Sequence, residues 1–244
     1  MLVVWHHPGL GDHLICNGLV NYLADQHDRI FLPCKPQYLD TVRCLYAEQP
    51  KVEPFAVARW PDDVEDAARK HGCDILRVGH ERTNPNRFDA SFYRQLNIPF
   101  EVRYTRFALP QRIPHEEELF ECLAPGGDYC LVHAECSSGV YTLDIPGALP
   151  RVRIERSTDP FGNLLAYRML MTKAAEIHCI NSSAIHLVDG VPTRARLFYH
   201  AVRRTDFSLR PCWTVVTYSA RPTRRLWRHA VARARTVYAR GLAR

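Results

Sequence analysis

The chain opens with a short apolar run, a glycine turn and a segment of helical periodicity, and this succession constrains the fold more than any other feature. Residues 2–5 (Leu-Val-Val-Trp) predict a buried strand, residues 8–12 (Pro-Gly-Leu-Gly-Asp) a turn, and residues 13–26 a helix. Strand, glycine turn and helix in this order are typical of an α/β domain. The same alternation continues to residue 78 and starts again at residue 129.

The alternation predicts two α/β halves. The first half has further strands at 29–32, 52–57 and 74–78 and helices at 36–48, 62–71 and 88–96. The second half has strands at 129–133, 151–155, 176–180, 196–201 and 213–218 and helices at 161–174 and 184–188. Proline and glycine around a short helix at 115–123 separate the two. We therefore expect an N-terminal domain over 1–112, a C-terminal domain over 127–220 and a tail over 221–244.

Composition supports a folded protein with a cationic end. The chain has 244 residues, of which 46% are hydrophobic and 24% charged, which is ordinary for a globular protein. No apolar run approaches the ~18 residues that span a bilayer, and the N-terminus lacks a basic export signal. We therefore expect a cytoplasmic protein. Residues 207–244 hold nine Arg and no acidic residue, and the rest of the chain has 23 basic and 26 acidic groups.

The tail predicts an amphipathic cationic helix over 221–244. Trp227, Tyr238 and Leu242 lie on one side at helical spacing, and arginine side chains lie mostly on the other. Such a helix suits an anionic membrane surface, here the inner face of the membrane, or it packs back on the N-terminal domain. We do not expect specific nucleic-acid binding, because no reader motif accompanies the charge.

The nine cysteines do not predict a metal centre. None forms a Cys-x-x-Cys pair, and we expect reduced and mostly buried thiols. A zinc site would require residues far apart in the sequence to come together. His6 and His7 are adjacent, and adjacent side chains on a strand point to opposite faces, so they do not share one metal easily.

The loop Gly9-Leu10-Gly11-Asp12 is the first candidate for a functional site. It lies just beyond the carboxyl end of the first predicted strand, where open α/β sheets bind ligands. A helix N-terminus there offers N–H groups to an anion, and Asp12 offers a carboxylate that can act as a general base. The loop equally fits a plain turn with a capping Asp12. It is not the Gly-x-Gly-x-x-Gly fingerprint of dinucleotide binding.

A second candidate loop opens the predicted helix at 184–188. Asn181, Ser182 and Ser183 are small hydrogen-bonding residues that can cradle a phosphate or merely cap the helix. His186 lies on roughly the same side as the two serines, although a lone histidine is more often structural.

A third candidate loop follows the strand at 129–133. It carries the ionisable pair His133 and Glu135 and the small residues Ser137 and Ser138. It contains no basic residue, and it also fits a solvated loop. Three such loops at strand ends are jointly more informative than any one of them.

Three stretches resemble a known family. His7-Pro8-Gly9-Leu10-Gly11-Asp12-His13-Leu14-Ile15-Cys16-Asn17-Gly18-Leu19 resembles the N-terminal loop of GT-B-type glycosyltransferases. It is most similar to a group from bacteria and large DNA viruses, and more distantly to the ADP-heptose:lipopolysaccharide heptosyltransferases. The stretch from Glu176 to Asp189 resembles the C-terminal donor motif of the same group, and Phe88-Asp89-Ala90-Ser91-Phe92-Tyr93 resembles its middle segment.

The resemblance implies a fold, a reaction and a set of residues. The fold would be two small Rossmann-like halves, with the donor nucleotide held mainly by the C-terminal half. Asp12 would match the acidic residue that deprotonates the acceptor hydroxyl. The implied acceptor-side loop residues are Gly9, Gly11, His13 and Asn17. The implied donor-side residues are His133, Glu135, Ser137, Ser138, Asn181, Ser182, Ser183 and His186.

The chemistry of glycosyl transfer fits these residues. A nucleotide-sugar donor would meet a hydroxyl of a glycan or lipid-linked acceptor, and one carboxylate acting on a direct displacement predicts inversion at the anomeric carbon. No Asp-x-Asp motif is present, so we expect neither a metal nor a cofactor at the donor diphosphate. The alternatives are a non-catalytic protein that binds a nucleotide or sugar, favoured by Asn181 where heptosyltransferases carry Asp, and a nucleic-acid-associated protein that uses the tail.

Overall fold

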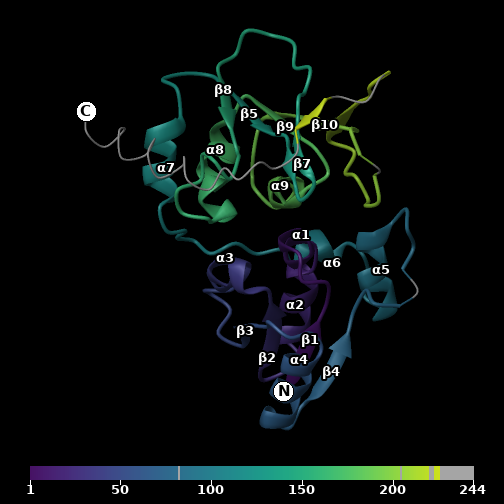
Figure 1. Cartoon of the computed structure of the whole chain (residues 1–244). Coiled ribbons are helices and arrows are strands. Elements are labelled where there is room, and N and C mark those ends of the chain that lie inside the picture. The colour runs from purple at the N-terminus through teal and green to yellow at the C-terminus, as the bar shows by residue number, and fades with distance from the viewer. Residues whose placement is uncertain (82, 204, 220–222, 226–244) are drawn as a thin grey trace. The chain divides into compact units, whose positions relative to one another are not determined.

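The computed structural model of the chain describes residues 1–81, 83–203, 205–219 and 223–225, which fall into two compact units (Figure 1). The first unit contains Met1–Arg112 together with Asp206–Ser208, and the second contains the other described residues. Each unit is built on a parallel sheet, which confirms the expected α/β fold with two Rossmann-like halves. None of the described helices has the length and apolar character needed to cross a membrane.

The sheet of the first unit has four parallel strands in the order β3-β2-β1-β4. Its strands are β1 (Leu2–Trp5), β2 (Ile30–Cys34), β3 (Val52–Ala56) and β4 (Asp74–Arg77). Its helices are α1 (Leu10–Ile15), α2 (Asn17–Ala24), the 3₁₀ turn η1 (Pro36–Tyr38), α3 (Leu39–Leu45), α4 (Asp62–His71), α5 (Phe88–Gln95) and α6 (Val102–Thr105). Because β2 and β4 lie on opposite sides of β1, the strand order reverses between β1 and β4.

Helix α4 covers one face of this sheet. Val3 and Trp5 of β1 point to the same face because they are two residues apart, and Phe31 of β2 joins them. Val64 and Ala68 of α4, one helical turn apart, complete this buried apolar cluster. The sequence pattern of alternating strand residues and four-residue helix spacing thus fixes how α4 lies on the sheet.

Residues 206–208 return to the first unit and are held there by α5. The Phe88 N–H donates to the Asp206 carbonyl at 2.7 Å, and the Ser208 N–H donates to the Asp89 carboxylate at 3.0 Å. Asp89 is fully buried, and its charge is met by the guanidinium of Arg103, which is also buried. A buried carboxylate needs such partners, so the return of the chain supplies part of the hydrogen bonding that Asp89 requires in the core.

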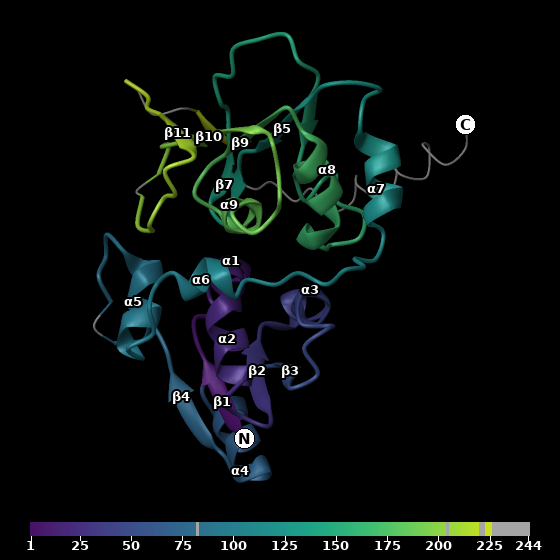
Figure 2. The ribbon, with the colours of Figure 1, turned by 180° about the vertical axis from the view of Figure 1, so that it is seen from behind.

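The second unit has a five-stranded parallel sheet in the order β11-β10-β9-β5-β8, seen from behind in Figure 2. Its strands are β5 (Cys130–His133), β8 (Arg151–Arg153), β9 (Glu176–Cys179), β10 (Arg196–His200) and β11 (Trp213–Val216). Its helices are α7 (Glu116–Leu123), the 3₁₀ turn η2 (Leu164–Tyr167), α8 (Arg168–Lys173) and α9 (Ser183–Val188).

Two predicted helices begin three residues away from their expected start. The helix predicted at 13–26 begins earlier, at Leu10, and is divided at Cys16 into α1 and α2. The helix predicted at 161–174 begins only at Leu164, as a 3₁₀ turn. The reason for the later start is Asn163, whose side chain accepts a hydrogen bond from the Leu165 N–H and thereby caps the segment.

A small antiparallel sheet corrects two further expectations. The predicted loop at 134–139 contains β6 (Glu135–Cys136) and the start of β7 (Gly139–Tyr141), which form a hairpin. Arg224–Arg225 form strand β12, which pairs with β7, so the helix predicted from residue 221 is wrong for these two residues. Pairing with β12 satisfies backbone groups along the edge of the hairpin. Residues 221–222 and 226–244 lie outside the described part of the chain.

Candidate active site

The first unit brings the loop after β1 beside the loop after β4. Strand order reverses between these two strands, and in open parallel sheets ligands bind beyond the carboxyl ends at such a point. The His7 side chain joins the two loops, because its Nε2 lies 2.8 Å from the carbonyl oxygen of Gly79 and donates to it. The His7 ring also stacks on His80, with centroids 4.9 Å apart. Neither histidine was among the predicted site residues.

Asp12 lies in the first turn of α1 and folds back on the loop. Its Oδ2 accepts a hydrogen bond from the Gly9 N–H at 3.1 Å. A side chain at residue 9 would place its Cβ only 2.5 Å from that oxygen, so glycine is required for this approach. The alternative role of Asp12 as the N-cap residue is wrong, because Gly9 is the N-cap and Asp12 is the third residue of α1. The bond from the Gly9 N–H nevertheless holds the carboxylate in place.

The environment of Asp12 suits a base. The side chain is half-buried, and burial raises the pKa of Asp12 to about 6, against the opposing effects of His7, the Gly9 N–H bond and Lys35. At neutral pH the carboxylate is thus largely ionised, yet its pKa is close enough to neutrality for efficient proton transfer. A desolvated carboxylate at the carboxyl edge of a parallel sheet is the arrangement expected of a catalytic base.

The other predicted residues of this loop lie deeper. His13 is fully buried, and its ring meets His6 edge to face with centroids 4.5 Å apart. Among the described residues neither ring nitrogen of His13 has a hydrogen-bond partner, and burial holds the pKa of both histidines below the usual range, so the rings are neutral. His13 therefore supports α1 from the core.

Asn17 is also buried, and Gly11 is half-buried in the first turn of α1. The Asn17 side-chain oxygen accepts from the Ala108 N–H at 2.8 Å and from the Asn21 side chain at 3.2 Å. These bonds tie α2 to a distant segment of the same unit, which is a structural contribution of Asn17.

The second unit has its reversal of strand order between β5 and β9. Strand β8 lies beyond β5, and β10 and β11 lie beyond β9. The loops after β5 and β9 therefore leave the sheet at adjacent points, and the Ile180 N–H donates to the His133 carbonyl at 3.2 Å. Both predicted donor-side loops thus come together at the position where the fold favours a ligand.

The hairpin after β5 holds the predicted residues in different settings. His133 is buried, its Nδ1 donates to the Ile154 carbonyl at 2.8 Å, and burial lowers its pKa to about 4, so it is neutral. Ser137 is exposed at the tip of the hairpin, and the Ser138 hydroxyl contacts the Cys136 sulfur at 3.1 Å. Only Ser137 among these three presents its side chain freely to solvent.

Glu135 pairs with a basic residue that the sequence analysis did not single out. Its Oε1 lies 2.9 Å from Arg156 Nε, and its Oε2 accepts from the Arg156 backbone N–H at 2.9 Å. Burial raises the pKa of Glu135, and Arg156 opposes this effect. Arg156 follows β8 by three residues, so the guanidinium stands at the same edge of the sheet.

The loop after β9 has a second such arginine. Ser182 is the N-cap residue of α9, but its hydroxyl donates to the Ile180 carbonyl at 3.3 Å and does not cap the helix. The Arg203 guanidinium donates to the Asn181 carbonyl at 3.1 Å. Ser183 begins α9 half-buried, and His186 is buried within it. Open α/β sheets bind ligands beyond the carboxyl ends of their strands. This rule, applied to the strands predicted at 151–155 and 196–201, would have pointed to both arginines.

Comparison with known proteins identifies the architecture. No family model and no curated protein matches the sequence. Among solved structures, the chain is similar to the iron-containing dodecameric glycosyltransferase TibC of enterotoxigenic E. coli, with a TM-score of 0.58, 13% identity and coverage of 99% of this chain and 76% of that one. The fold is that of GT-B glycosyltransferases.

Two other solved structures share the GT-B fold. The glycosyl transferase family 9 protein of Veillonella parvula has a TM-score of 0.55 and 9% identity, covering 88% of this chain and 86% of that one. E. coli ADP-heptose lps heptosyltransferase II has a TM-score of 0.55 and 11% identity, covering 99% and 98%. The GT-B architecture inferred from three short stretches is therefore confirmed, whereas identities this low leave the reaction to be argued from the residues.

Proposed function

We propose that this chain is a glycosyltransferase that moves a sugar from a nucleotide-sugar donor to a hydroxyl of a glycan or glycolipid acceptor. The observation that carries the proposal is Asp12, a half-buried carboxylate with a pKa raised to about 6 at the carboxyl edge of a GT-B sheet. Structural neighbours support it, since TibC has also been solved in complex with ADP-D-β-D-heptose.

Asp12 is the general base in this proposal. Its carboxylate takes the proton of the acceptor hydroxyl while the hydroxyl oxygen attacks the anomeric carbon of the donor. The bond from that carbon to the diphosphate oxygen breaks, and the nucleoside diphosphate leaves with the electron pair. Because attack and departure occur on opposite sides of the carbon, the configuration inverts.

The second unit supplies the donor site. The departing diphosphate is an anion, and Arg156 and Arg203 are cations beside the two loops of that site. The N–H groups at the start of α9 and the side chain of Ser183 can donate to phosphate oxygens, and the Ser182 hydroxyl can do so once it releases the Ile180 carbonyl. The loop residues His133, Glu135, Ser137, Ser138, Asn181 and His186 form the rest of the proposed donor pocket. No metal is required for this charge balance.

A binding and turnover experiment tests the proposal. Nucleoside diphosphates are screened by thermal shift, and a ligand at one hundred times its dissociation constant should stabilise the fold by about 2.7 kcal/mol. Donor consumption and product configuration are then followed by NMR. Absence of any nucleotide binding contradicts the donor site. Binding without turnover would leave a non-catalytic binding protein, and a retained configuration would contradict direct displacement by Asp12.

The tail extends this proposal to the membrane. A lipid-linked acceptor would be reached at the cytoplasmic face, and residues 221–244 contribute arginines suited to anionic headgroups. Binding of the full chain to vesicles containing anionic lipid should weaken as salt is raised and disappear on truncation after Ser219. Binding that does not respond to salt, or that survives truncation, would contradict this docking.

A further inference from the structure

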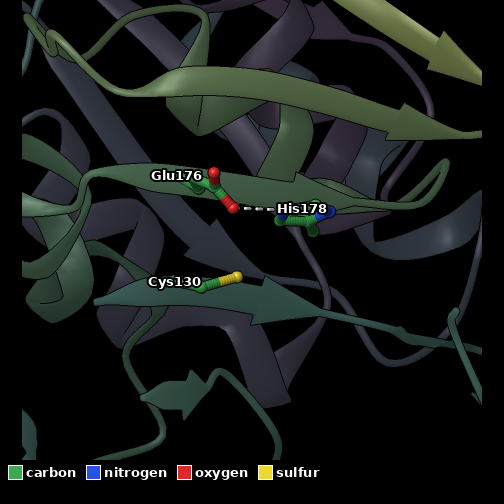
Figure 3. Close-up of side chains that lie close together, drawn as sticks. All are labelled: Cys130, Glu176 and His178. Atoms are coloured by element: carbon green, nitrogen blue, oxygen red, sulfur yellow. Dashed lines mark hydrogen bonds and ion pairs between the residues drawn. The ribbon is translucent and has the colours of Figure 1, made fainter. Parts of the chain in front are cut away.

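A group of three potential metal ligands lies on one face of the second sheet. Cys130 of β5 pairs with Glu176 of β9, and the neighbouring pair on this face is Val132 with His178. Residues two apart on a strand point to the same side, so Cys130, Glu176 and His178 share a face (Figure 3). One ligand atom from each of the three lies within 4.8 Å of the others.

The three side chains are largely shielded from solvent. Cys130 is 1% exposed and His178 is 3% exposed, while Glu176 is half-buried. The Nε2 of His178 lies 3.4 Å from Oε2 of Glu176, and the other carboxylate oxygen, Oε1, pairs with the guanidinium of Arg196. Arg196 thereby orients the carboxylate and leaves Oε2 on the side of the cysteine and histidine.

Contacts behind His178 hold its ring. The Nδ1 of His178 lies 2.8 Å from Nε2 of His200, and Nδ1 of His200 lies 2.5 Å from the Tyr218 hydroxyl. The His178 ring also stacks on Phe198 with centroids 4.5 Å apart. Metal-binding histidines characteristically use the second ring nitrogen in a hydrogen bond of this kind, which fixes the tautomer and the ring orientation.

The tautomer that donates from Nδ1 of His178 needs a cation in front of Nε2. In that state Nε2 carries a lone pair, and it faces a carboxylate oxygen that is also only an acceptor. Two acceptors at this separation repel unless a positive ion lies between them. Either a metal ion bound to Nε2 or a proton on Nε2 would remove this repulsion. Cys130 becomes a ligand in the first case and takes no part in the second.

We propose that Cys130, Glu176 and His178 bind a Zn²⁺ ion. Thiolate, imidazole and carboxylate are all zinc ligands, and three of them leave one tetrahedral position for water. The thiolate and the carboxylate together neutralise the charge of the ion, so the occupied group adds no net charge to the interior. On binding, the Cys130 S–H bond breaks, the sulfur bonds to zinc, and the proton leaves to solvent.

The surroundings of Cys130 suit a thiolate ligand. Cys130 pairs with Arg151 in the register of β5 and β8, so a cationic residue begins the neighbouring strand.

The proposed ion is structural. Cys130 and Glu176 begin β5 and β9, and His178 is the third of the four residues of β9, so all three ligands lie on the strands and not in the proposed donor loops. The ion would join the two strands from which the donor loops leave.

The test uses metal binding by the full chain, stripped first with a chelator. Added Zn²⁺ should bind at one ion per chain by native mass spectrometry, and Co²⁺ should give the charge-transfer absorption of a thiolate ligand. Cys130→Ser and Glu176→Gln should each lower the affinity for Zn²⁺ by more than about 100-fold, since even second-layer changes cost 10–100-fold. Cys212→Ser, which removes an exposed thiol of the same unit, should leave the affinity unchanged.

His200→Gln tests the positioning contact. It should lower the affinity by about 10-fold while the Co²⁺ spectrum keeps its thiolate band, because the ligands remain. Circular dichroism of each metal-free variant separates lost folding from lost binding. No stoichiometric binding by wild type, unchanged binding in Cys130→Ser or Glu176→Gln, or loss of binding in Cys212→Ser would overturn the proposal. These measurements need no nucleotide-sugar donor, so their outcome is independent of whether the proposed transferase function is correct.

Discussion

The carboxyl edges of the two sheets occupy the same topological position and have opposite chemistry. In the first unit the edge presents Asp12, a carboxylate made basic by burial. In the second unit the edge presents Arg156 and Arg203 beside the loops after β5 and β9. The fold thus supplies two equivalent places for a ligand, and in the proposed reaction a few loop residues let one place accept a proton and the other receive an anion.

The largest expected effect comes from removing the base. Asp12→Asn keeps an oxygen that can accept from the Gly9 N–H but cannot take a proton, so kcat should fall by about 10²–10⁴-fold. Its melting temperature should equal or exceed that of wild type near pH 7, because the fold disfavours the ionised side chain. Steady-state kinetics with a nucleotide-sugar donor, beside a thermal melt, measures both.

Asp63 provides the matched control for this variant. Its carboxylate also accepts backbone N–H groups, from Ala58 and Arg59, at the start of α4. It is half-buried, and these hydrogen bonds lower its pKa. Asp63→Asn should leave kcat unchanged. Equal losses in the two variants would mean that Asp12 acts through helix capping, and full activity in Asp12→Asn would remove it from the mechanism.

A smaller effect is expected at the second edge. Arg203→Gln should weaken nucleoside diphosphate binding by roughly 10-fold, the lower end for a hydrogen bond to a charged group, because Arg203 is exposed. Arg194→Gln, which removes an exposed charge before the amino end of β10, should leave binding unchanged. Isothermal titration calorimetry compares the two variants. Equal weakening in both would indicate a general effect of net charge.

The smallest effect is the pH dependence of the first edge. Since burial raises the pKa of Asp12 to about 6, kcat/KM should be flat above this pH and fall about tenfold per unit below it. The same shift makes Asp12 favour the folded state below pH ~4 and lose that contribution as pH rises through about 6. A rate profile with no break near pH 6 would show that another group supplies the base.

Local pattern predicted most of the elements. The helix predicted at 62–71 is α4, and Gly72 ends it with a φ of +59°, which glycine adopts without strain. The apolar runs at 2–5 and 130–133 are strands β1 and β5. Pattern failed at 134–139, where a hairpin forms, because its stability depends on pairing with a distant strand.

The sequence by itself determined the alternation of strands and helices, the glycine that lets Asp12 fold back, and the three stretches that pointed to a GT-B architecture. Tertiary structure decided which distant residues meet. Arg156 reaches Glu135, and Cys130 reaches Glu176 and His178, only because β8, β5 and β9 are neighbours in the sheet. Strand order is set by packing across the whole unit. Spacing along the chain therefore does not predict these side-chain contacts.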